Sequence, residues 1–223
     1  MDYSRTIKYF AEDKSTLSRN AKIILIIAGI FLLPAVGLGL IPIAIVVVLH
    51  FTDKSYNKNR ISDYELDQIC ESQFPDLKDV ALNKIGLDED EVNATNHIQV
   101  SSYDMTSKGS IKYRQGKDGM WRSSQYEVAL FFFSNELVHC FVRRFSVLRN
   151  EQKDTMEEYF YRDIVSLKVA HDDKSAHGGE CIELTTSAGT TFRYSFKPSD
   201  SEKVNRSISA MRNLIKEKKQ GMN

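Results

Sequence analysis

The residues best suited to chemistry are two histidines and two aspartates within one short stretch. They are His171, Asp172, Asp173 and His177, and two glycines follow them. A protein metal site usually needs three or four ligands that converge on one point. Aspartates are, however, expected in a glycine-ended turn whether or not a metal binds there. We therefore predict a solvated turn and no metal site.

His139 and Cys140 form a second pair whose residue types could take part in catalysis. A cysteine nucleophile needs its histidine within hydrogen-bonding reach. These two residues are neighbours in a predicted strand, so their side chains point to opposite faces. The chain also has no glycine-rich phosphate loop, no G-x-S-x-G and no H-E-x-x-H motif. We predict no catalytic residues, no cofactor and no enzymatic activity, and keep an enzyme with an unrecognised site as the less favoured alternative.

The composition excludes two further classes of site. The cysteines Cys70, Cys140 and Cys181 are odd in number, far apart and form no C-x-x-C. Such a set argues against a disulfide framework and against a zinc site, so we predict buried thiols. Lys and Arg total 30, and Asp and Glu also total 30. No concentrated basic face is evident, and we predict no nucleic-acid partner.

Two adjacent cations, Arg143 and Arg144, lie in the middle of a predicted strand. One of them should point outward and the other toward the core. Pairing with Glu157, Glu158 or Asp163 is the favoured interpretation, and an exposed contact with a protein partner is the alternative.

The most distinctive stretch of the chain is an apolar run at residues 23–49 that contains no charged side chain. As one helix it would be about 40 Å long, enough to cross a hydrocarbon core of about 30 Å with some tilt. We predict a transmembrane anchor in contact with a lipid bilayer, following a polar tail at residues 1–22. A re-entrant hairpin with limbs at 23–33 and 43–49 is the alternative. The unpaired cysteines favour a cytoplasmic soluble domain behind a single-pass anchor.

Residues 50–96 are predicted to form a linker and an acidic helical connector. Ser62 and Glu65 resemble a capping box at the start of one helix. Pro75 interrupts the apolar pattern, and a second helix should follow it and end at Gly86. Self-association through this connector would make the chain a structural membrane component, which is an alternative function. The sequence itself predicts no oligomeric state.

From residue 97 to residue 219 the pattern is that of one soluble domain. Apolar residues alternate with polar ones as in strands, most clearly at 126–133, 137–148 and 180–197. A final helix, from about 200 to 219, carries an apolar stripe spaced four, three and four. The stripe consists of Val204, Ile208, Met211 and Ile215. The helix should therefore pack one face on the preceding sheet.

The stretch YFYRDIVSLKV at 159–169, followed by ECIELTTSAGTTFRYSF and the final helix, resembles the bacterial pleckstrin-homology-like and GRAM-like group. The resemblance covers a little over half of the chain. It implies an α+β fold in which a bent antiparallel β-barrel or sandwich is capped by a C-terminal α-helix. With the preceding elements, the predicted order is a transmembrane helix, a short helical connector and this domain.

The resemblance also implies a binding or scaffold module. With the predicted anchor, we expect it at the bacterial plasma membrane. Some members of the wider fold bind phosphoinositides through basic residues in the first strand loop. The cations in and near that loop are Lys108, Lys112, Arg114, Lys117 and Arg122. They are candidate contacts for an anionic surface, and Arg143 and Arg144 for a protein partner. We expect a non-catalytic, membrane-anchored module that recognises a protein partner or a membrane surface.

Overall fold

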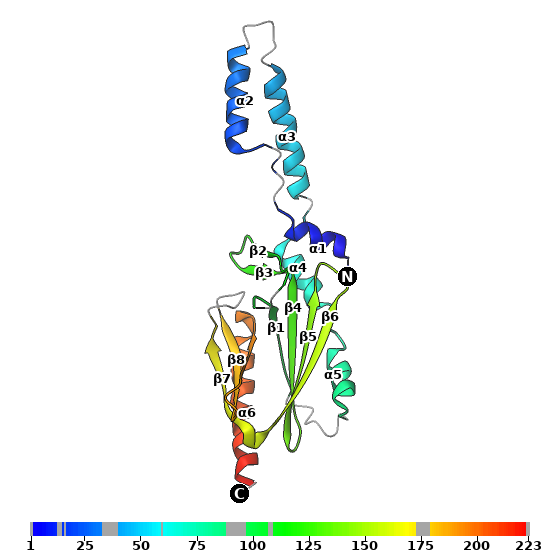
Figure 1. Cartoon of the computed structure of the whole chain (residues 1–223), viewed down its shortest axis with the longest axis vertical. Helices are drawn as coiled ribbons and strands as arrows, with labels where there is room; N and C mark the ends of the chain where they lie inside the picture. Colours follow the sequence, from blue (N-terminus) through cyan, green and yellow to red (C-terminus); the bar gives the residue numbers. More distant parts are fainter. Residues whose placement is uncertain are drawn as a thin grey trace. The chain divides into compact units, whose positions relative to one another are not determined.

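A computed structural model describes residues 2–12, 15, 17–32, 40–58, 60–87, 97–106, 109–172 and 179–221. The chain divides into two compact units. One unit is Ser4–Ser62, and the other consists of Asp63–Asn223 together with Met1–Tyr3. Figure 1 shows the elements of each unit.

The first unit is helical. It contains most of α1 (Tyr3–Phe10) and all of α2 (Arg19–Leu32) and α3 (Leu40–Lys58). Helices α2 and α3 lie side by side and run in opposite directions (Figure 1). At the polar end of this hairpin, the Lys22 ammonium lies 3.4 Å from the Asp53 carboxylate. The apolar run at 23–49 therefore contributes to two helices.

The prediction of a transmembrane helix at 23–49 is wrong. Within the described ranges, no helix is both long enough and apolar enough to cross a membrane. Helix α2 has 14 residues, about 21 Å, and α3 has 19 residues but carries Asp53, Lys54 and Lys58 in its second half. The predicted single-pass placement in a bacterial plasma membrane rested on that helix and is wrong with it. Residues 33–39, which lie within the predicted anchor, are outside the described residues.

The second unit begins with two helices and a four-stranded antiparallel sheet. Helix α4 (Asp63–Glu71) and helix α5 (Leu77–Ile85) occupy the predicted connector. Gly86 ends α5 in the left-handed conformation, with φ of 77°, as its position predicts. The sheet order is β1-β4-β5-β6. Its strands are β1 (Ile98–Tyr103), β4 (Gln125–Phe133), β5 (Leu137–Ser146) and β6 (Gln152–Phe160).

Two smaller antiparallel sheets and a helix complete this unit. A two-stranded sheet pairs β2 (Tyr113–Gln115) with β3 (Trp121–Ser123). A three-stranded sheet has the order β7-β8-β9, with β7 (Ile164–His171), β8 (Glu180–Thr186) and β9 (Thr191–Ser195). Short 3₁₀ turns at Tyr161–Asp163 and Pro198–Asp200 precede β7 and the last helix, α6 (Ser201–Gly221).

The hydrophobic core lies between the four-stranded sheet, the three-stranded sheet and α6. Strand β4 contributes Phe131 and Phe133, and β8 contributes Ile182 and Leu184. Phe131 is fully buried and meets the ring of Tyr194 edge-to-face at 5.3 Å between centroids. The predicted apolar stripe of α6 faces this core, where it contributes Val204, Ile208, Met211 and Ile215.

The other face of the four-stranded sheet is also covered. Leu130, Phe132 and Phe141 point away from the core cluster and are nonetheless fully buried. Helix α5 contacts β5, and its residues Leu77 and Leu82 are buried. Burial on both faces explains why β4 reads as an almost continuous apolar run.

The structure confirms the α+β class and corrects its details. Among the described residues, the strands form three separate sheets, so the hydrogen bonding does not close a barrel. Strand β6 is not among the strands that the sequence pattern marked most clearly, because its side chains are exposed or half-buried and give little apolar signal. The turn at Tyr161–Asp163 separates β6 from β7, which belong to different sheets.

Candidate functional site

The predicted first-loop cations do not form one cluster on the surface. Lys112 and Lys117 are exposed, Arg114 is half-buried in β2, and Lys108 lies outside the described residues. Arg122 is 1% exposed and cannot contact an anionic surface directly. The part of the loop that remains available to such a surface is therefore small.

Arg122 instead organises a buried polar network. Its guanidinium donates to both carboxylate oxygens of Asp67 at 2.9 and 2.8 Å and to those of Asp118 at 3.0 and 2.7 Å. The Tyr103 hydroxyl donates to Asp67 at 2.7 Å, and the Cys70 thiol lies 3.7 Å from that hydroxyl. These bonds connect α4 with β1 and β3. The hydrogen bonds from Arg122 hold the pKa of Asp118 below its usual value, whereas burial raises the pKa of Cys70 to about 12.

A glycine makes this arrangement possible. A Cβ atom at Gly116 would come within 2.6 Å of Asp118 Oδ1 and 2.8 Å of Asp63 Oδ2, and it would also collide with the Arg122 guanidinium. A side chain at this position would therefore displace these polar groups from the positions they occupy. The partners in the network are fully engaged with one another, which fits an architectural role.

Arg143 and Arg144 are both paired within the sheet. Arg143 makes a two-pronged contact with Asp154, at 2.8 Å for each bond, and Lys84 of α5 lies 2.5 Å from the same carboxylate. Arg144 contacts Glu127 at 2.5 Å. The partners differ from the three carboxylates that the sequence favoured. The cross-strand neighbours decide the pairing, since Asp154 lies opposite Arg143 in the β5–β6 register.

The pairing of Asp154 predicts a pH dependence. Hydrogen bonds from Arg143 and Lys84 lower the pKa of Asp154 in the folded state. A carboxylate whose pKa is lowered by folding stabilises the fold at any pH above its pKa in the unfolded chain. This contribution is lost as the pH falls through its lower pKa in the folded chain. Asp154→Asn should therefore destabilise the chain at neutral pH, and its difference from wild type should shrink below about pH 4. Urea unfolding of both proteins from pH 7 to pH 3 tests this; a difference that stays constant would contradict it.

His139 and Cys140 occupy separate environments. The His139 ring lies 3.1 Å from Glu158 Oε1 and 3.2 Å from Ser134 Oγ. Burial raises the pKa of Cys140 to about 12. A thiol with a raised pKa carries little of the thiolate that acts as nucleophile.

The predicted turn with two histidines is described only in part. His171 ends β7, and the Asp172 carboxylate accepts a hydrogen bond from Ser195 at 2.8 Å. Asp173 and His177 lie outside the described residues. Where the structure is described, no group of three or more His, Cys, Asp or Glu residues could hold a metal ion.

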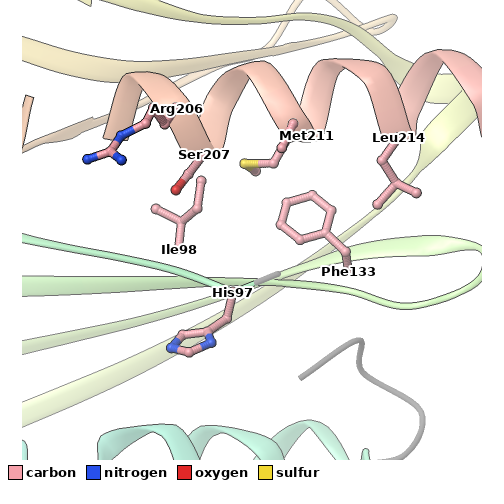
Figure 2. A pocket seen from close by; sticks show the side chains of 8 residues that line it. His97, Ile98, Phe133, Arg206, Ser207, Met211 and Leu214 are labelled. Carbon is pink, nitrogen blue, oxygen red and sulfur yellow. The ribbon is translucent and has the colours of Figure 1, made fainter. Parts of the chain in front are cut away.

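One recess lies between α6 and the first strands of the large sheet. Figure 2 shows Ile98, Phe133, Met211 and Leu214 around it. Its volume is about 230 Å³. Pockets for drug-sized ligands usually measure about 300–1,000 Å³. The recess, whose lining also includes His97, Arg206 and Ser207, is small for such a ligand.

A larger and more charged groove lies on the opposite flank of α6, against β7. Its volume is about 490 Å³. Four cations line it: Lys168 from β7, and Arg212, Lys216 and Lys219 from α6. The three on α6 are spaced four and three residues apart, so they share one side of the helix. We call this feature the basic groove.

Two cations of the basic groove are bound to the edge of the three-stranded sheet. Arg212 Nε donates to the carbonyl of Leu167, and Lys219 Nζ donates to that of Ile164, each at 2.6 Å. Lys168 lies 2.9 Å from Glu183. Lys216 is exposed, and the described part of the chain offers its ammonium neither an ion pair nor a hydrogen bond. Of these four cations, Lys168 alone is paired with a carboxylate of the described residues, so the groove carries a net positive charge.

The basic groove was not predicted from the sequence. Lysines at the end of α6 have an ordinary explanation in the helix dipole. The available signal was the spacing of Arg212, Lys216 and Lys219 beside the apolar stripe, which places cations along the line where the helix meets its neighbour. The contribution of β7 could not be seen without the sheet order.

No protein-family model, curated protein or solved structure matches this chain. The resemblance to the pleckstrin-homology-like group therefore remains a prediction from the residues quoted for it.

Proposed function

We propose that the unit formed mainly by Asp63–Asn223 is a non-catalytic binding module that holds an acidic segment of a protein partner in the basic groove. The observation that carries the proposal is the line of cations on α6, which together with Lys168 of β7 lines a groove of about 490 Å³. Residues 212 to 219 span about 10 Å along the helix, the length of three extended residues. An acidic stretch could thus meet several cations at once.

The shape of the site favours a protein segment over a membrane surface. A bilayer is flat on this scale, whereas the cations of α6 and β7 line a concave space. An extended chain can enter such a groove and bring several of its side chains close to the cations. Val165, 66% exposed on β7, offers an apolar contact beside the charges. Charged contacts of this type contribute mainly to specificity and to the association rate, and salt weakens them.

A charge reversal in the groove tests the proposal. Lys216→Glu in the full chain should weaken binding of a fluorescein-labelled peptide of alternating Glu and Ser by about tenfold, because one attraction is replaced by a repulsion. Lys203→Glu is the matched control, since Lys203 is exposed on the same helix and outside the groove. Fluorescence anisotropy at low and at physiological salt measures both.

The outcomes separate the alternatives. Binding that is weakened by salt and by Lys216→Glu, and retained by Lys203→Glu, supports the proposal. Equal losses in both variants would show a diffuse charge effect and reject the groove. Binding only to vesicles with anionic headgroups, and never to the peptide, would assign the groove to a membrane surface instead.

A further inference from the structure

The second feature that needs an occupant is the helical hairpin of the first unit. Helices α2 and α3 expose large apolar side chains along their length. Phe31 is 81% exposed, and five others lie between 58% and 65%: Ile24, Leu40, Ile41, Val48 and Phe51. Soluble proteins rarely expose an apolar surface of this extent without a partner. The Lys22–Asp53 ion pair closes the polar end of the hairpin, so the two helices form a defined structure.

The apolar surface is not confined to one face of either helix. Residues 23–32 and residues 40–49 contain no charged side chain, and neither stretch contains Ser, Thr, Asn, Gln or His. A helix that packs one side on a protein and shows the other to water has a polar face. A second copy would cover one side of the hairpin and leave the other in water. Only surroundings that enclose both helices satisfy the pattern, and lipid hydrocarbon provides them.

The dimensions fit one leaflet of a bilayer. Each apolar stretch of ten residues is about 15 Å long, half of a hydrocarbon core of about 30 Å. Helices satisfy their own backbone hydrogen bonds in hydrocarbon. Polar residues lie at the other end of both helices: Arg19 and Lys22 begin α2, and Asp53 and Lys54 lie in the second half of α3. Long lysine and arginine side chains can reach the headgroups from there.

We infer that the α2–α3 hairpin inserts into one leaflet of a lipid bilayer, with the start of α2 and the end of α3 at the same surface. This insertion requires no helix that crosses the bilayer. It is independent of the basic groove, because the hairpin and the groove belong to different units.

Depth-dependent fluorescence quenching tests the inference in the full chain. Trp121 is the only tryptophan, so Trp121→Phe gives a background without tryptophan emission. Phe31→Trp then places a probe in the apolar part of the hairpin, and Tyr56→Trp places a matched aromatic probe at its polar end. Both proteins are added from detergent to vesicles of phosphatidylcholine and phosphatidylglycerol, brominated either near the end or near the headgroup side of the acyl chains.

The emission of the Phe31→Trp probe should shift to the blue. Bromines near the ends of the acyl chains should quench most of this emission. The Tyr56→Trp probe should respond chiefly to the shallow bromines or to neither. Absence of quenching of the Phe31→Trp probe by every brominated lipid would overturn the inference, even if the protein floats with the vesicles. A blue shift that requires only a higher protein concentration, without lipid, would assign the hairpin to a second copy.

Discussion

Arg122→Ala is expected to lower the free energy of unfolding by about 3–5 kcal/mol, the range for breaking a buried ion pair from one side. The guanidinium is 1% exposed and makes four hydrogen bonds to Asp67 and Asp118. Its removal leaves two carboxylates near each other without a cation, and it disconnects α4 from β3. The loss is large because the guanidinium is almost fully buried and all four of its hydrogen bonds are removed, although the Asp67 and Asp118 side chains remain 22% and 34% exposed.

Equilibrium unfolding in urea, followed by circular dichroism, measures this loss. Arg149→Ala is the control, because Arg149 pairs with Glu151 and both side chains are more than half exposed, at 62% and 58%. An exposed pair of this kind contributes about 0–1 kcal/mol. A loss for Arg122→Ala no greater than that of the control would show that the network does not stabilise the fold.

Phe131→Ala should cost about 3–5 kcal/mol, the range observed when a buried phenylalanine is truncated. The side chain is fully buried between the two larger sheets, and its ring contacts that of Tyr194 from the three-stranded sheet. The truncation removes apolar burial, opens a cavity and deletes this ring contact. The same urea experiment applies, with Val165→Ala as a control at a site 66% exposed.

The control should change the free energy by no more than about 0.5 kcal/mol. If Phe131→Ala behaves like the control, the two sheets are not held together through this residue. If Phe131→Ala alone lowers the slope of the unfolding free energy against urea concentration, the substitution has changed the compactness of the unfolded or the native state.

Local patterns were sufficient for the parts of the fold in which one face is buried. The stripe of α6 and the apolar run of β4 were read correctly, because side-chain periodicity follows directly from the geometry of helix and strand. Strand β6 was missed for the same reason. It forms an edge of its sheet, its side chains are exposed or half-buried, and no apolar period marks it.

The site depends on contacts that no local pattern carries. Arg122 was grouped with surface cations because it lies close to the predicted first strand loop. Its main partner, Asp67, stands 55 residues away on α4. The basic groove likewise needs β7 and α6 to be brought together. Hydropathy alone also cannot show where an apolar run changes direction, so residues 23–49 were read as one helix although they contribute to two.

The contact of α6 with β7 has a consequence for how copies of this chain meet. An edge strand presents unpaired carbonyl and amide groups, and another chain can extend the sheet there and start a fibril. At Ile164 and Leu167, these carbonyls already accept hydrogen bonds from Lys219 and Arg212. Two side chains thus occupy acceptors that a foreign strand would need. The helix that completes the hydrophobic core thereby also opposes intermolecular strand pairing at the start of this edge.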